Sequence, residues 1–321
     1  MQTQEIHRPA SAIPVALLPG TPLQTRFLNV LLVIWRAMTT SRRVAMGSAI
    51  VGFFIAVGLF GPFFMTIDPT ATSHLFIAPP SPAHWLGTTV VGEDTFSEMV
   101  YGTRTSVFWG LGTGLLVTLI SVVVGLVSGY FGGWVDDALT LLTNISLVLP
   151  ALPLAIVLAA YFPRGPLTIS LVIVTTNWAW QARVLRSQTL SMRNREFVTA
   201  ARVSGESTWR IIFYEIFPNE IGLVVAGFVS TTIYVVLTWA ALEFLGLGDG
   251  TIPSWGSILY WAQQAGALGG GLWWWFVPPG ACIALLGAGL SLINFGIDEV
   301  ADPRLRSTRP VKVKKSAKAV A

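Results

Sequence analysis

The feature that most constrains this chain is a series of long apolar stretches without a single Asp, Glu, Lys or Arg. A helix needs about 20 apolar residues to cross the hydrocarbon core of a bilayer. Only 11% of the 321 residues are charged, whereas soluble domains carry roughly a quarter. The sequence therefore predicts an all-α, polytopic membrane protein. The uncharged stretches are residues 44–67, 105–135, 138–163, 165–182, 221–242 and 250–297.

These stretches predict about six transmembrane helices. The last stretch is too long for one span, and its glycine-rich first half is typical of a loop or re-entrant segment. A tryptophan cluster within it (Trp255, Trp261, Trp273, Trp274 and Trp275) suits anchoring at the level of the lipid headgroups. At the end of the fourth span, Arg183 and Arg186 are expected to extend to the interface. The predicted spans are 44–65, 105–130, 138–161, 166–187, 222–245 and 273–297.

The Lys and Arg residues predict the orientation, because cytoplasmic connections carry an excess of both. In a six-span arrangement, all of them except Arg104 and Arg164 fall on one side. We therefore expect both termini, and the connection between spans four and five, in the cytoplasm. The predicted divisions are a cytoplasmic segment 1–43, a first helix with an outer loop 44–104, a five-helix core 105–297 and a basic cytoplasmic tail 298–321.

Two predictions concern the ends of the chain. The short apolar stretch 27–35, bracketed by Arg26 and Arg36, indicates an interfacial helix rather than a span. Residues 312–321 carry four lysines, and we expect a disordered tail near anionic lipid.

Several function classes are excluded by what the sequence lacks. A single cysteine, Cys282, permits no intrachain disulfide, and the histidines have no metal-site spacing. No catalytic constellation and no Gly-x-x-x-x-Gly-Lys-Ser/Thr phosphate loop occurs. The basic residues form no continuous stripe, which argues against nucleic-acid binding. Inside the spans, Asn144 and Asn177 are candidates either for hydrogen bonds between helices or for the translocation pathway.

The cytoplasmic connection 188–221 has the pattern of two helices joined by a bend. Residues 195–203 are good helix formers, and Gly205 can adopt the left-handed conformation that ends a helix. Ser207 is a candidate N-cap for a second helix, 208–217, and Pro218 marks its limit or a kink. The pattern predicts a short helix along the membrane face, a sharp bend and a return.

This connection resembles the "EAA" loop of permease subunits of binding-protein-dependent ABC importers. The family pattern is Glu-Ala-Ala, three residues, Gly, nine residues, Ile, one residue, Leu-Pro. Thr199-Ala200-Ala201, Gly205 and Pro218 stand at the family spacing. The chain departs from the pattern at three positions, with Thr199 for Glu, Glu215 for Ile and Phe217 for Leu.

The resemblance extends to most of residues 40–306 and is closest to the dipeptide/oligopeptide/nickel branch of this family. Trp239 departs from it, since an acidic residue is expected there. The similar segments are 85–88, 92–94, 101–106, 129–136, 244–248, 253–256 and 302–306.

The resemblance implies a type I ABC importer permease fold in the bacterial inner membrane. It also implies a second homologous permease subunit, two cytoplasmic ATPase subunits and an extracytoplasmic binding protein as partners. No catalytic or metal site is expected on this chain, and ATP and Mg²⁺ are expected on the ATPase subunits. The residues that the resemblance assigns to ATPase coupling are Thr199, Ala200, Ala201, Arg202, Gly205, Ser207, Arg210 and Pro218. For Arg202 and Arg210, positive-inside anchoring is an equal alternative.

The predicted function is therefore half of a translocation pathway for di- and oligopeptides. Import of oligosaccharides or of a nickel complex by the same kind of assembly is the alternative substrate prediction. A secondary transporter or channel, which needs no ATP, is disfavoured because the spans have few ionisable residues near the midplane. A membrane enzyme is disfavoured by the missing catalytic groups.

Overall fold

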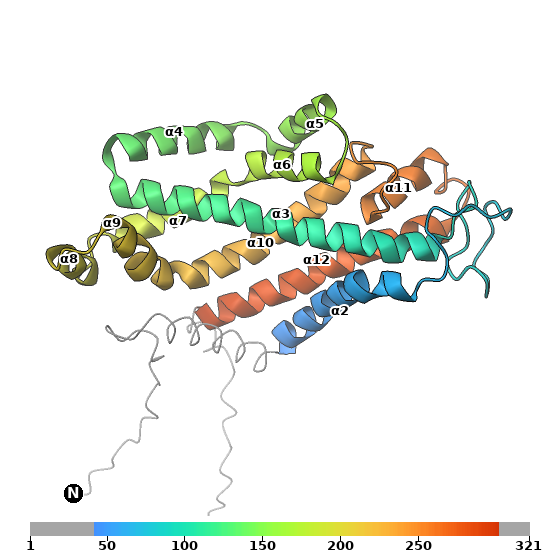
Figure 1. Ribbon diagram of the computed structural model, residues 1–321, viewed down its shortest axis with the longest axis horizontal. Helices are drawn as coiled ribbons and strands as arrows, with labels where there is room; N and C mark the ends of the chain where they lie inside the picture. The colour runs from blue at the N-terminus through green and yellow to red at the C-terminus, as the bar shows by residue number, and fades with distance from the viewer. Residues whose placement is uncertain (1–41, 302–321) are drawn as a thin grey trace, which may run out of the picture.

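The computed structural model describes residues 42–301, and all regular elements in this range are helices. The helices form an elongated bundle, with α8 and α9 at one end and α11 with the loop after α2 at the other (Figure 1). The predicted interfacial helix at 27–35 and the tail 302–321 lie outside the described residues. The helices are α2 (Arg42–Phe64), α3 (Thr95–Phe131), α4 (Gly133–Val148), α5 (Ala151–Tyr161), α6 (Pro166–Asn177), α7 (Ala179–Met192), α8 (Glu196–Val203), α9 (Thr208–Arg210), the π-helix η2 (Ile211–Ile216), α10 (Phe217–Phe244), α11 (Trp255–Gln264) and α12 (Trp273–Ala301).

Four of the predicted spans form helices that are long and apolar enough to cross a bilayer. They are α2, α3, α12 and the continuous helix that joins α9, η2 and α10 over Thr208–Phe244. In the described part of the chain, the number of spans by length and composition is four, or five if the bent pair α4 and α5 is counted as one. Helix α3 begins at Thr95, ten residues before the predicted start, because the Asp94 carboxylate caps it by accepting from the Ser97 amide at 2.8 Å.

The third predicted span, 138–161, is not one straight helix. It bends by 89° between α4 and α5. Leu149 has an extended backbone (ψ 130°), and Pro150, which follows it, has no amide hydrogen to continue the helix. A proline also disfavours the helical conformation of the residue before it, which accounts for the bend.

The fourth predicted span, 166–187, is also interrupted, at Trp178 between α6 and α7. The Trp178 carbonyl accepts a hydrogen bond from Ser121 Oγ of α3 at 2.7 Å, which stabilises the break inside the bundle. Arg186 does not simply extend to the interface as predicted. Its guanidinium makes two hydrogen bonds to the Asp136 carboxylate, at 2.6 and 2.7 Å, and so ties α7 to α4.

Glycines let α3 approach two neighbours closely. A Cβ at Gly110 or Gly114 would lie 2.8 Å or 2.5 Å from side chains of α10. A Cβ at Gly125 or Gly129 would lie 2.7 Å or 2.6 Å from side chains of α7. Each pair is spaced by four residues, the small-residue pattern of closely packed membrane helices. The core of the bundle is therefore α3 with α7 on one side and α10 on the other.

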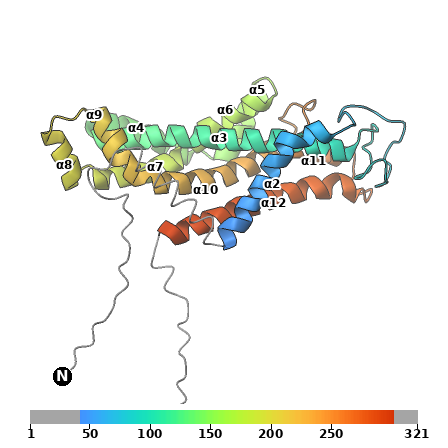
Figure 2. The ribbon, with the colours of Figure 1, turned by 60° about the horizontal axis from the view of Figure 1, so that its bottom comes forward.

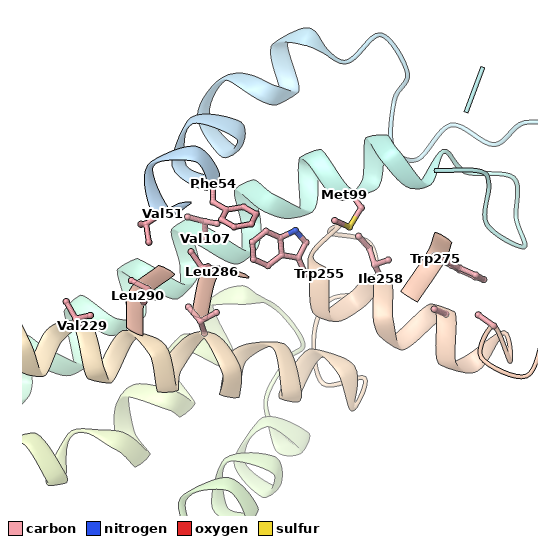
Figure 3. Close-up of a cluster of buried hydrophobic side chains, with 13 residues drawn as sticks. Val51, Phe54, Met99, Val107, Val229, Trp255, Ile258, Trp275, Leu286 and Leu290 are labelled. Carbon is pink, nitrogen blue, oxygen red and sulfur yellow. The ribbon is translucent and has the colours of Figure 1, made fainter. Parts of the chain in front are cut away.

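Helix α11 is held at the end of the bundle by Trp255, which is fully buried (Figure 3). The Trp255 ring packs edge-on against Phe54, and its indole nitrogen donates to Thr103 Oγ1 at 3.2 Å. The predicted headgroup anchoring is wrong for Trp255 and for Trp275, because both side chains lie in the protein core. It fits Trp273, which is 52% exposed. Hydropathy could not distinguish burial in protein from burial in lipid.

A view turned by 60° shows α2 crossing α12 on the face opposite α4 (Figure 2).

Candidate functional site

The segment between α7 and α10 forms the short helix and sharp bend that the sequence predicts. Helix α8 runs from Glu196 to Val203. It ends in two hydrogen bonds, from the Gly205 amide to the Arg202 carbonyl and from the Glu206 amide to the Ala201 carbonyl, each 3.1 Å long. Gly205 has φ +80°. This is the Schellman arrangement, which needs a residue that adopts the left-handed conformation without strain.

Ser207 caps the next helix as predicted, and its Oγ accepts from the Arg210 amide at 3.4 Å. Of the two alternatives predicted at Pro218, the helix limit is wrong, since the helix that begins at Thr208 continues through it to Phe244, and the kink stays a prediction. The π-helix Ile211–Ile216 directly precedes α10, and Pro218 stands in the first turn of α10. A proline is tolerated there because its missing amide hydrogen leaves no bond of the regular α-helix unmade.

Helix α8 is attached to the bundle by one buried side chain and one cation–π contact. Val198 is fully buried and packs in a cluster with Ile212 and Ile216 of the π-helix. The Arg202 guanidinium lies 5.2 Å from the centre of the Tyr130 ring at the end of α3, and its Nε donates to Tyr130 Oη at 3.3 Å. A displacement of α8 therefore acts directly on both α10 and α3.

The opposite face of α8 is exposed and carries small side chains. Thr199 and Ala200 are exposed, and Val203 is 84% exposed. Ala201 is half-buried and packs against the cluster that holds Val198. The Thr199 hydroxyl donates to the Arg195 carbonyl within α8. Arg210 pairs with Glu206 at 2.5 Å, so both candidate coupling arginines already have a partner within the chain.

A second candidate site is a cavity of about 590 Å³ beside the two interrupted helices. Irregular backbone inside a membrane protein is tolerated where it lines such a cavity. The lining carries hydroxyl and amide groups and no charged side chain. The lining residues are Ser146, Leu147, Leu149, Pro150, Ala151, Thr176, Asn177, Ala179, Trp180, Gln181, Ser230, Thr231 and Tyr234.

The structure separates the two asparagines that the sequence singled out. Asn177 lines the cavity, and its Nδ2 donates to the Ile173 carbonyl at 3.0 Å and to Thr176 Oγ1 at 2.8 Å. Asn144 is not in the lining, and its side chain accepts a hydrogen bond from Arg183. Within residues 42–301, no cluster of His, Cys, Asp or Glu is arranged to hold a metal ion.

Sequence analysis missed Gln181, which lines the same cavity and is 6% exposed. A signal was available, since Gln181 is a long polar residue inside an uncharged stretch. Arg183, two residues later, lies near the end of the fourth predicted span, and this closeness concealed the role of Gln181 inside the bundle. The break at Trp178 brings it into the bundle instead.

Known proteins resemble this chain over most of its length. Residues 121–307 match a family described as "Binding-protein-dependent transport system inner membrane component". The oligopeptide transport system permease protein OppC of Bacillus subtilis (strain 168) is 33% identical over 83% of this chain and 87% of that protein. The dipeptide transport system permease protein DppC of the same organism is 30% identical over 85% of each. The glutathione transport system permease protein GsiD of Pectobacterium atrosepticum is 30% identical over 71% of this chain and 75% of that protein.

Proposed function

Because the chain belongs to the family of binding-protein-dependent transport system inner membrane components, we propose that it forms half of the translocation pathway of an ATP-driven importer of di- and oligopeptides. Membership makes it a permease of an ABC importer, a transport component rather than an enzyme. The relatives at 33% and 30% identity are named for oligopeptide and dipeptide transport, which supports peptides as the substrate.

The single observation that carries the coupling part of the proposal is the arrangement of α8. Its exposed face offers Thr199 and Ala200 to a partner surface. Val198, with the half-buried Ala201 beside it, and Arg202 attach it to the spans. A partner ATPase that grips the exposed face would move α3 and α10 together. Gly205, Ser207, Arg210 and Pro218 maintain the bend and the return to α10 that such a transfer requires.

The proposal includes the partners and the orientation. A second, related permease completes the pathway, two ATPase subunits bind ATP and Mg²⁺ in the cytoplasm, and a binding protein delivers substrate on the other side. The α8 end of the bundle then lies in the cytoplasm, with both termini, as the distribution of Lys and Arg favours. The cavity lies on the translocation pathway, with Asn177 in its wall. Asn144, which accepts from Arg183 on α7, stays the second pathway candidate.

The cavity lining supports peptides through its chemistry. A peptide main chain presents neutral donors and acceptors, which match the hydroxyl and amide groups of the wall. Oligosaccharides have a similar demand for neutral polar groups and are the alternative substrate. A nickel complex, the other alternative, is the weakest match, because the cavity wall contributes no His, Cys, Asp or Glu.

The test is uptake by the complete complex of both permeases and both ATPases in proteoliposomes, with the binding protein outside. Labelled tri-alanine, a labelled trisaccharide and a nickel–histidine complex are compared. Each is tested with and without ATP enclosed in the proteoliposomes, on the side of the ATPases. ATP-dependent uptake of tri-alanine is the expected result. ATP-dependent uptake of another substrate alone would exclude peptides, and uptake without the ATPases would favour the secondary-transporter alternative.

A further inference from the structure

Gln181 is the one cavity residue whose side chain is buried in the bundle and incompletely hydrogen-bonded. It lies in the first turn of α7, directly after the break at Trp178. Gln181 Oε1 accepts from Thr231 Oγ1 of α10 at 3.1 Å. Within residues 42–301, Gln181 Nε2 has no hydrogen-bond acceptor. A buried amide donor without a partner is unfavourable, and its persistence calls for an explanation.

The amide is held in a notch on α10. A Cβ at Gly227 would lie 2.4 Å from Gln181 Nε2 and 2.9 Å from Cδ, so the notch exists because residue 227 is glycine. Thr231 stands one turn further along α10 and holds the other end of the amide. Gln181 therefore bridges α7 and α10 at the level of the cavity, with its donor turned against the α10 backbone.

These two helices are also the ones that α8 connects. Three residues separate the end of α7 from the start of α8. Helix α10 follows α8 after α9 and the π-helix. Near α8, a second polar contact joins them, from Thr189 Oγ1 to Glu220 Oε1 at 2.9 Å. A movement of α8 that shifts α7 against α10 would withdraw the Gln181 amide from its notch. The amide would then face the cavity, which Gln181 lines.

We propose that Gln181 is a substrate-contacting residue of the translocation pathway. Its side-chain amide is sequestered by Gly227 and Thr231 in the present arrangement and hydrogen-bonds the peptide main chain when α7 and α10 move apart. Gly227 and Thr231 are positioning residues in this proposal, since they act through Gln181. The inference rests on the proposed function for the choice of a peptide as ligand.

The ligand chemistry follows from the wall of the cavity. No side chain of the wall is charged, so neither terminus of a peptide finds a counter-ion there. Near Gln181, Asn177 and the half-exposed Tyr234 add neutral hydrogen-bonding groups from α6 and α10. These groups recognise the main chain, which every peptide shares, and so allow many sequences to pass.

The experiment measures binding of labelled tri-alanine to the complete permease–ATPase complex in nanodiscs, without the binding protein, with and without a non-hydrolysable ATP analogue. Gln181→Met keeps the length of the side chain and removes the amide. Loss of one neutral hydrogen bond weakens binding by about fivefold, and we expect this in the nucleotide state that binds peptide more tightly. Gln264→Met, at an exposed position of α11, is the matched control and should bind as the wild type does.

Two variants of the positioning residues should act in the opposite direction. Thr231→Val removes the group that holds the amide, and Gly227→Ala fills the notch. Either change should make peptide binding independent of the nucleotide. Gly227→Ala, whose residue lies outside the cavity wall, should also leave binding as tight as in the wild type, or tighter. The double variant Gln181→Met/Thr231→Val should behave like Gln181→Met, because the positioning effect requires the amide.

The outcomes separate this inference from the proposed function. Equal binding by wild type and Gln181→Met in both nucleotide states would overturn the role of Gln181 alone. So would a Gly227→Ala variant that weakens binding as much as Gln181→Met does, since a purely structural bridge between α7 and α10 predicts that result. A wild-type complex that binds no tri-alanine in either state would overturn the inference, whereas the proposed function fails only if the uptake assay with the binding protein shows no ATP-dependent transport of tri-alanine.

Discussion

Replacing Gly205 tests whether the bend after α8 couples the ATPases to the spans. Gly205 has φ +80°, and no atom lies within 4 Å of a Cβ added there. A substitution therefore meets no steric obstacle, and its cost comes from the backbone alone. A left-handed residue with a Cβ costs about 1–2 kcal/mol, a β-branched residue costs more, and Asn tolerates this conformation.

These costs predict a graded series. Since about 1.4 kcal/mol is a factor of ten in an equilibrium, Gly205→Ala should lower the equilibrium constant for forming the bend by roughly five- to thirtyfold. Gly205→Val should lower this constant further, and Gly205→Asn should stay close to the wild type. Gly205 lies at the α8 end of the bundle, outside the packed spans, so we expect the same amount of each variant in the membrane.

The assay is tri-alanine uptake per ATP hydrolysed by the reconstituted complex. We expect the ratio to fall in the order Gly, Asn, Ala, Val, while ATP hydrolysis continues. Gly222→Val on α10, where a Cβ also meets nothing within 4 Å, controls for the added side chain. Equal coupling by Asn and Val variants of Gly205 would refute the backbone argument, and normal uptake by Gly205→Val would refute the role of the bend.

Three further predictions concern how α8 and the bundle are held together. Val198→Ala should destabilise the attachment of α8 by about 1–3 kcal/mol and reduce uptake, whereas Val203→Ala, on the exposed face, should leave the fold of α8 unchanged; limited proteolysis of the segment reads out both. Gly129→Val should lower the melting temperature of the purified complex, because even its Cβ would meet α7 at 2.6 Å, and Gly112→Val, with nothing within 4 Å, should not. Asp136→Asn should loosen α4 from α7 and raise the rate at which a cysteine introduced on α4, in a Cys282→Ser background, cross-links to lipid-phase probes; an unchanged rate would contradict the role of the ion pair.

The coupling segment was predictable because its signals are local. Gly205 and Ser207 act on the backbone within a few residues, so the helix end and the N-cap follow from residue type and spacing. The helix limit offered at Pro218 does not form, since a helix can accommodate a proline when a π-helix precedes it, and that adjustment depends on how Ile212 and Ile216 pack. The Thr199 hydroxyl donates to the Arg195 carbonyl one turn earlier.

The spans were predictable only where one helix stays straight. Apolar length located α2, α3 and α12, because crossing a bilayer imposes that length. The Leu149–Pro150 step carried a signal for the bend at α4, which an uninterrupted hydropathy window concealed. The cavity could not be predicted, since Asn177, Gln181 and Tyr234 come together only through the packing of α6, α7 and α10.

By itself, the sequence determined that this chain is a helical membrane protein with one polar connection that bends at Gly205, since hydrophobic length and backbone preference are properties of short segments. Tertiary structure alone decided which polar groups face one another. The same tryptophan type is core at 255 and surface at 273, and the same uncharged stretch holds both a straight helix and a break, because contacts between distant segments determine what each side chain meets.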